Sequence, residues 1–132
     1  MTRHGRTISP GKASGEALVS RMGISFYGGV DPETGVITEA GHDLEGHSIA
    51  GRVLVFPVGK GSTVGSYILY RLKKNGHAPA AIVNTACETI IAVGCIIAEI
   101  PCMDQVELDG IETGMVLDVN ANASGEGVIR IR

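Results

Sequence analysis

The chain has 132 residues, of which 44% are hydrophobic and 19% are charged, and this composition predicts one globular domain with a packed core. Eleven basic and fourteen acidic residues give a net charge of −3, which argues against nucleic acid or an acidic membrane as the main partner. No apolar stretch is long enough to cross a bilayer, and the N-terminal segment has no apolar core of a secretory signal, so we expect a cytoplasmic protein.

Short β-rich segments punctuated by glycine run along the chain. In order they are RTIS (6–9), EALVS (16–20), GVIT (35–38), RVLVF (52–56), AAIVN (80–84), MVLDV (115–119) and GVIRIR (127–132). The segment GVDPETGV (29–36) joins Asp-Pro to a following glycine. This combination predicts a tight loop.

The first predicted helix covers about residues 62–74. Val64, Ile68 and Leu72 share one face, with Leu69 beside them. Asn75-Gly76 then offers a left-handed stop for the helix.

The second predicted helix starts near Thr85 or Cys87 and runs to Gly94. Residues 96–100 (IIAEI) are expected to return to a strand, which Pro101 ends. The middle of the chain is therefore predicted to follow the order β–loop–α–β–α–β between β-rich ends. We predict a single α/β domain that covers residues 1–132.

A glycine-rich loop, PVGKGSTVGS (57–66), lies between the strand 52–56 and the first helix. Gly59 and Gly61 would let the backbone approach a ligand, and the free N–H groups at the start of the helix would favour an anion. Lys60 adds a cation, and Ser62 and Thr63 can cap the helix or contact the ligand. The alternative interpretation is that Ser62 is only an N-cap and the glycines only form a turn. The spacing fits neither the P-loop nor the dinucleotide fingerprint, which argues against a nucleotide.

The hydroxyl of Ser62 cannot act as a base unaided. If its pKa is near that of water, ~15.7, ionising it near pH 7 costs about 12 kcal/mol. A helix N-terminus offsets at most ~2 kcal/mol, and an oxyanion-hole donor adds about 3–4 kcal/mol. Catalysis by Ser62 would therefore require a strong neighbouring cation or a metal-polarised substrate. This shortfall points to a partner chain.

The remaining reactive side chains form no recognisable constellation. Cys87, Cys95 and Cys102 include no C-x-x-C pair and predict no disulfide framework, so we interpret all three as small buried apolar residues. His42 and His47 have no cysteine or carboxylate at zinc-ligand spacing, so we expect scattered surface or loop histidines and no metal site. The acidic residues Asp31, Glu33, Asp43 and Glu45 flank predicted turns, where carboxylates are usually solvated.

Several segments, in order, resemble the small subunit of the aconitase X family. They are GKASGEALV (11–19), SFYGGVDPETGVI (25–37), GHDLEGHSIAG (41–51), PVGKGSTVGS (57–66) and APAAIVN (78–84). The resemblance covers about residues 11–100. It implies a swivelling β/β/α domain, β-rich with two to three helices, that closes over the active site of a hydro-lyase.

The resemblance also implies a heterodimer with a separate large aconitase-like subunit. That partner would supply the cysteine ligands of a 4Fe-4S cluster, with no cofactor on this chain. The implied reaction removes water from a phosphorylated hydroxy acid, (R)-5-phosphomevalonate, to give trans-anhydromevalonate 5-phosphate in a modified mevalonate pathway of isoprenoid biosynthesis. Ser62 would accept the proton while the iron acts as a Lewis acid. Gly59, Lys60, Gly61 and Thr63 would contact the substrate.

The second family segment contains Phe26, Tyr27, Gly28, Gly29 and Asp31. One interpretation places this loop at the active-site mouth or the subunit seam, which makes Gly28, Gly29 and Asp31 candidate substrate contacts. The other is a structural turn with Phe26 in the core.

Two other functions stay open. A relative of the same architecture dehydrates cis-3-hydroxyproline, and a non-catalytic anion-binding module would also use the glycine loop. A phosphoryl-carrier domain would require a histidine, and residues 57–66 contain none.

Overall fold

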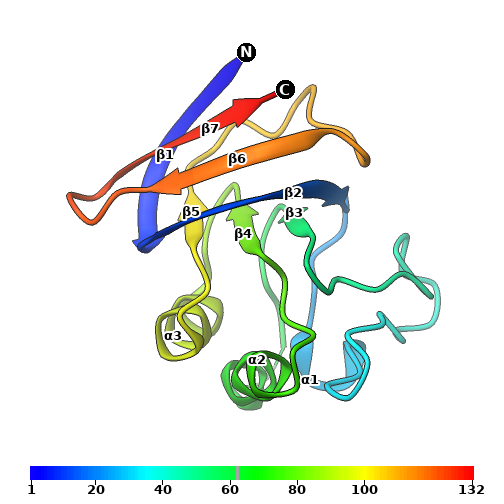
Figure 1. Cartoon of the computed structure of the whole chain (residues 1–132). Coiled ribbons are helices and arrows are strands. Elements are labelled where there is room, and N and C mark those ends of the chain that lie inside the picture. The colour runs from blue at the N-terminus through cyan, green and yellow to red at the C-terminus, as the bar shows by residue number, and fades with distance from the viewer. Residues whose placement is uncertain (62) are drawn as a thin grey trace.

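A computed structural model describes residues 1–61 and 63–132. Its described residues form a closed barrel of seven strands with helices on one side (Figure 1). The strands are β1 (Thr2–Ser9), β2 (Gly11–Val19), β3 (Val53–Phe56), β4 (Ala81–Asn84), β5 (Cys102–Asp104), β6 (Val116–Ala121) and β7 (Glu126–Ile131). The helices are α1 (Phe26–Gly29), α2 (Val64–Lys74) and α3 (Thr89–Ala98). None of the helices in the described part of the chain has the length and apolar character needed to cross a membrane.

The barrel combines a parallel half and an antiparallel half. Its strand order is β1-β5-β4-β3-β2-β6-β7, and β2, β3, β4 and β5 are parallel neighbours. The helices α2 and α3 connect β3 to β4 and β4 to β5, and both pack below the parallel strands in Figure 1. The predicted α/β order of the middle of the chain is confirmed.

Buried parallel strands separate two hydrophobic cores. All four residues of β3 and all four of β4 are buried, as expected for strands that are covered on both faces. Along β3, Val53 and Val55 pack inside the barrel, whereas Leu54 and Phe56 pack against the helices. The helix-side core therefore lies between the parallel strands and the helices that cover them.

Helix α2 buries Ile68, Leu69 and Leu72 and ends where predicted. Gly76 has φ +78°, and the N–H of His77 donates to the carbonyl of Leu72 at 2.9 Å. These are features of a Schellman C-terminal stop. Val64, predicted on the same helix face as Ile68 and Leu72, is the first residue of the helix and is 42% exposed.

Helix α3 begins and ends later in the chain than the sequence pattern predicted. It begins at Thr89, with Glu88 accepting a hydrogen bond from the Ile90 N–H, and continues to Ala98. The predicted strand at 96–100 is therefore wrong. The buried residues Ile91, Cys95 and Ala98 recur at helical spacing, and the chain turns at Glu99, which has φ +57°.

Two further differences from the prediction concern strands. The segment 35–38 forms no strand among the described residues, although Val36 and Ile37 each make an isolated bridge. The strand predicted before Pro101 instead follows it, as β5. β5 has only three residues, so its pattern gave little periodicity to recognise.

A buried carboxylate ties the barrel to the helix layer. Asp104 accepts two hydrogen bonds from the Arg6 guanidinium, at 2.9 and 2.8 Å, and one from the Cys87 N–H at 2.9 Å. Burial acts to raise the pKa of Asp104, but the hydrogen bonds from Arg6 and Cys87 outweigh it and hold the pKa below its ordinary value.

We predict that acid weakens the fold through Asp104. Its lowered folded-state pKa contributes stability that is fully present above the unfolded pKa of about 4 and is lost as pH falls through the folded value. Asp104→Asn should lower the free energy of unfolding by about 1–3 kcal/mol at pH 7 and flatten its decline between pH 5 and 3, measured by urea denaturation. Asp118→Asn, at the exposed pair with Arg132, is the control and should have a smaller, salt-sensitive effect.

Two helical glycines should respond oppositely to alanine. A Cβ at Gly94 would lie 2.6 Å from Leu69 Cδ1 and 3.1 Å from the Cα of Ser66, whereas at Gly65 the nearest atom would be Ile90 Cγ2 at 3.4 Å. Gly94→Ala should cost about 1–3 kcal/mol by overpacking. Gly65→Ala should be neutral or stabilise by up to about 1 kcal/mol through helix propensity. Urea unfolding measures both, and equal effects would contradict the packing argument.

Candidate functional site

The glycine-rich loop leaves β3 and reaches the start of α2 beside the segment 23–29. The N–H of Ile24 donates to the carbonyl of Val58 at 3.3 Å, and the N–H of Lys60 donates to the carbonyl of Ile24 at 3.0 Å. Ile24 and Gly59 thereby form a short parallel bridge. Two segments that the sequence presents separately are therefore joined through their backbones.

The predicted catalytic residue, Ser62, lies outside the described residues. Its predicted neighbours are described: Gly59 is buried, and Lys60, Gly61 and Thr63 are exposed. Thr63 occupies the N-cap position of α2, but its side chain makes no capping hydrogen bond within the described part of the chain. The hydroxyl of Thr63 is therefore not committed to holding the helix start.

Close packing on two sides accounts for both glycines of the loop. A Cβ at Gly59 would overlap the Ile91 side chain of α3, and a Cβ at Gly61 would overlap Ser25 Oγ. Gly61 also has φ +105°, which disfavours other residues. The loop is thus packed between α3 and the segment around Ser25. This packing fixes the backbone of the loop.

The segment that follows Ser25 is a structural turn, as one of the two interpretations proposed. Phe26 is 1% exposed and packs against Phe56, with ring centroids 6.2 Å apart. Gly28 has φ +83° and is exposed, whereas Gly29 is buried. A role for these glycines in substrate contact stays a prediction.

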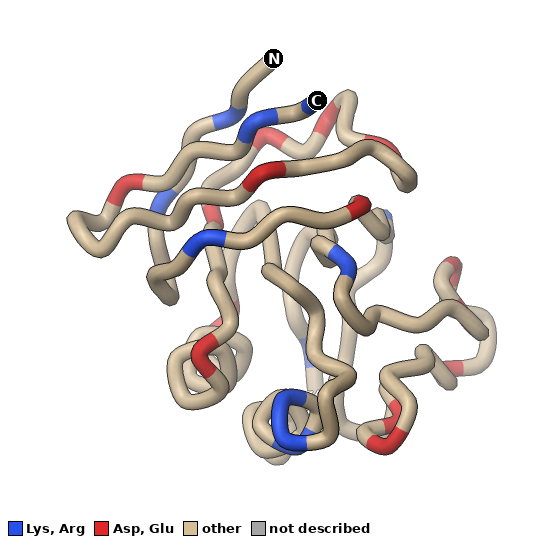
Figure 2. The backbone as a smooth tube through the Cα atoms, in the orientation of Figure 1, with Lys and Arg blue, Asp and Glu red and all other residues tan. Residues whose placement is uncertain are grey.

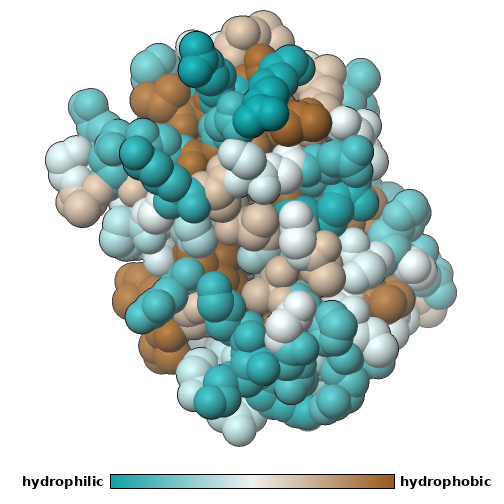
Figure 3. Space-filling model, in the orientation of Figure 1, coloured by the Kyte–Doolittle hydropathy of each residue, from teal (hydrophilic) through white to brown (hydrophobic). Residues whose placement is uncertain are grey.

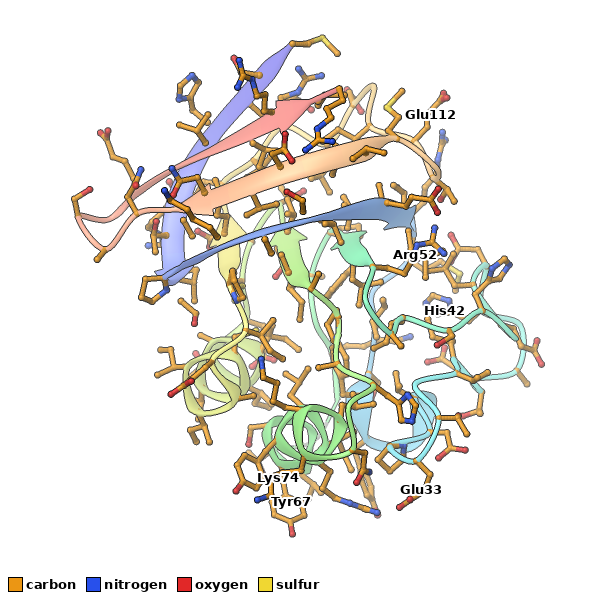
Figure 4. The ribbon with its side chains drawn as sticks, in the orientation of Figure 1. Glu33, His42, Arg52, Tyr67, Lys74 and Glu112 are labelled. Carbon is orange, nitrogen blue, oxygen red and sulfur yellow. The ribbon has the colours of Figure 1, made fainter. Side chains whose placement is uncertain are left out.

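Asp31 lies in a turn that contacts the C-terminal end of α2, whereas the glycine loop lies at its N-terminal end. Its Oδ1 accepts the Glu33 N–H at 2.9 Å, and the turn that it closes contacts the last turn of the helix through Glu33 and Arg71, 2.8 Å apart. Figure 4 shows Glu33 beside α2, and Figure 2 shows the basic residues that gather on this helix. The structure therefore places the turn of Asp31 away from the glycine loop at the helix start.

His42 is a buried residue that supports the segment beside the glycine loop. Sequence patterns did not predict this role. His42 lies in a loop, which is one of the two places expected for it, but it is buried, with only 5% of its surface exposed. Its Nδ1 accepts the Leu44 N–H at 3.0 Å, so Nε2 carries the proton and donates to the carbonyl of Gly23 at 3.1 Å. His42, labelled in Figure 4, thereby holds Gly23, the residue that precedes Ile24.

Asp43 anchors the same region rather than being simply solvated. It accepts hydrogen bonds from Ser20 Oγ at 2.7 Å and the Arg21 N–H at 3.0 Å. Burial acts to raise the pKa of Asp43, but these two hydrogen bonds, aided by His42, lower it overall. Ser20 donates to Asp43 and His42 to Gly23, so the three side chains do not form a serine–histidine–aspartate relay.

A cavity of about 650 Å³ opens beside the glycine loop, at the carboxyl ends of the parallel strands. Its lining includes Ser20, Pro57, Thr85 and Gln105, one from behind each of β2, β3, β4 and β5. Pro57 is the residue of the glycine loop that also lines the cavity. The loop therefore lies at the rim of the cavity rather than inside it.

The described residues do not fit an iron–sulfur cluster. Among them, no group of three or more histidine, cysteine or acidic side chains is placed to hold a metal ion. The sulfurs of Cys87 and Cys102 lie 3.9 Å apart, and hydrogen bonding to Cys102 together with burial raises the pKa of the Cys87 thiol. A thiol with a raised pKa is a poor source of the thiolate that metals bind.

Comparison with known proteins gives consistent results. A family model described as the aconitase X swivel domain matches residues 2–131. A protein of Thermococcus kodakarensis named phosphomevalonate dehydratase small subunit is 56% identical over 126 residues, which are 96% of this chain and 94% of that protein. A protein of the same name from Methanosarcina acetivorans is 55% identical, over 96% of this chain and 88% of its own.

Solved structures agree with the fold. The crystal structure of Thermococcus kodakaraensis aconitase X in its holo form contains a chain with 55% identity and a TM-score of 0.93, covering 98% of both chains. A solution NMR structure of a second relative, 47% identical, covers 100% of this chain and 99% of its own with a TM-score of 0.90. The expected swivelling fold is confirmed, and the chain belongs to the aconitase X swivel domain family.

Proposed function

We propose that this chain is the small subunit of a heteromeric hydro-lyase that converts (R)-5-phosphomevalonate into trans-anhydromevalonate 5-phosphate. The observation that carries the proposal is the 56% identity to a phosphomevalonate dehydratase small subunit over 96% of this chain. The geometry supports it, because the glycine loop presents Lys60, Gly61 and Thr63 at the start of an eleven-residue helix. Such a site suits an anionic substrate.

In this proposal Ser62 accepts the proton that leaves the substrate carbon, and Lys60 and the loop amides contact anionic groups of the substrate. The first turn of α2 contains no acidic residue, so no carboxylate of that turn opposes the helix dipole, which favours developing negative charge. Gly59 and Gly61 serve chiefly by allowing the loop to pack tightly. Contacts of Gly28 and Gly29 with the substrate complete the proposed set, from which Asp31 is left out because its turn contacts the other end of α2.

The partner in this proposal is a large aconitase-like subunit in a cytoplasmic heterodimer. The relatives' name, small subunit, implies a larger partner. We propose that the partner holds a 4Fe-4S cluster, since the described residues of this chain offer no ligand group for it. A bound cluster would supply Lewis-acid chemistry to the substrate. The unpaired cysteines fit a reducing compartment.

Ser62→Ala should abolish most turnover of the reconstituted complex while leaving the fold intact. Loss of a general base typically lowers kcat by about 10²–10⁴-fold. The measurement is steady-state dehydration of (R)-5-phosphomevalonate by this chain mixed with its large subunit. Ser66→Ala is the matched control, because Ser66 Oγ bonds to the carbonyl of Thr63 on the same helix and lies outside the proposed reaction. Near wild-type turnover in Ser62→Ala would favour the non-catalytic anion-binding module.

The substrate should be the phosphorylated acid rather than a hydroxylated proline. We expect the complex to dehydrate (R)-5-phosphomevalonate and to leave cis-3-hydroxyproline largely unchanged, because a cation such as Lys60 favours phosphate and a proline ring lacks that group. Product formation with each substrate, followed by mass spectrometry, decides between them. The chain without its partner should be inactive, and turnover by it alone would contradict the heteromeric proposal.

A further inference from the structure

An ion pair beside the glycine loop joins two segments that are distant in the sequence. Lys60 Nζ lies 3.3 Å from Glu39 Oε2, with the Lys60 side chain 49% exposed and the Glu39 side chain 28% exposed. Glu39 comes from the connection between β2 and β3 and falls between the segments that carry the family resemblance. Lys60 therefore does not extend freely into solvent beside its turn.

Two glycines leave space for the side chains of this pair. A Cβ at Gly23 would meet the Lys60 stem, 3.5 Å from Cδ and 3.7 Å from Cγ. A Cβ at Gly29 would lie 3.3 Å from Glu39 Oε1. The stem of Lys60 thus lies along Gly23 and the carboxylate of Glu39 rests over Gly29, so the pair spans the segment 23–29.

The backbone holds both ends of the pair in place. Lys60 is fixed by its N–H, which donates to the carbonyl of Ile24 at 3.0 Å. On the other side, the N–H of Thr38 donates to the carbonyl of Gly29 at 2.9 Å, and the carbonyl of Glu39 accepts the N–H of His42 at 3.2 Å. Because both attachment points are fixed, the ion pair restrains the ammonium group rather than the chain.

Such a restraint matters more for binding than for folding. Exposed ion pairs contribute little to stability, but a lysine stem has many rotamers, and ordering it costs binding free energy when it is free. An ammonium group has three N–H donors. One donor to Glu39 leaves two for an anionic ligand at the start of α2.

We infer that Glu39 is a positioning residue that holds the Lys60 ammonium ready for the phosphate of the substrate. This inference deepens the proposed function and rests on it. The opposing effect is repulsion between the Glu39 carboxylate and the phosphate, which salt screens over a Debye length of about 8 Å at 0.15 M. Positioning and repulsion predict opposite signs when the charge of Glu39 is removed, so an experiment separates them.

The test compares Glu39→Gln with Glu33→Gln in the reconstituted complex. Glu33 also pairs with a cation, Arg71 at 2.8 Å, but at the far end of α2. If Glu39 positions Lys60, Glu39→Gln should raise KM for (R)-5-phosphomevalonate about fivefold with kcat changed by less than about twofold. Glu33→Gln should leave both constants unchanged.

A double variant shows whether Glu39 acts through Lys60. Lys60→Met should raise KM more than Glu39→Gln, and adding Glu39→Gln to it should raise KM no further, because the two changes remove one shared function and only the repulsion from Glu39 is left to relieve. Effects that multiply, a lower KM in Glu39→Gln, or equal effects of Glu39→Gln and Glu33→Gln would each overturn the inference.

A second measurement does not depend on turnover and separates this inference from the proposed function. Titration of the full chain with inorganic phosphate, followed by the NMR signal of Lys60 Cε, should give a several-fold weaker affinity in Glu39→Gln than in wild type or Glu33→Gln. Unchanged affinity would overturn the inference even if the complex is active. If the complex is inactive with phosphomevalonate, the proposed function fails, while a weaker phosphate affinity in Glu39→Gln still supports positioning.

Discussion

The site depends on the short backbone bridge between Ile24 and Gly59. Two hydrogen bonds, from Ile24 to Val58 and from Lys60 to Ile24, join the loop after β3 to the connection after β2. A side chain at Gly59 would overlap Ile91 of α3, so the bridge forms only where the loop is free of a Cβ. The position of the loop is therefore a consequence of helix packing as much as of its own sequence.

The same connection is braced from several directions. Buried His42 bonds to Gly23, Asp43 bonds to Ser20, and Phe26 packs on Phe56 at the end of β3. These contacts place polar anchors on one side of the segment and the helix-side core on the other. Rigid support of this kind holds the ligand-binding groups of a loop in a defined geometry. The exposed part of the site is small, while the structure that orients it is buried.

Sequence patterns predicted the order of elements in the middle of the chain and the helix stop at Gly76, because these depend on local periodicity and turn chemistry. The predictions failed where contacts between distant residues determine the local structure. Ile96 and Ile97 are β-branched but lie in α3, since Ile91, Cys95 and Ala98 need one continuous buried face. Exposed Val93, Ile96 and Ile97 contribute to the apolar surface over α3 in Figure 3. Likewise, neither the buried place of His42 nor the pairing of Glu39 with Lys60 has a local signal, because each contact spans distant residues.

Closure of the barrel has a consequence for assembly. The strand order returns from β7 to β1, which pair from Thr2–Arg130 to Arg6–Glu126, so the sheet in the described part of the chain offers no open edge. A companion polypeptide cannot extend this sheet by adding a strand of its own. Recognition between subunits must instead rely on side chains and connecting segments. Such contacts can be remade as one body rotates against another, whereas a continuous ladder of main-chain hydrogen bonds would lock the two together.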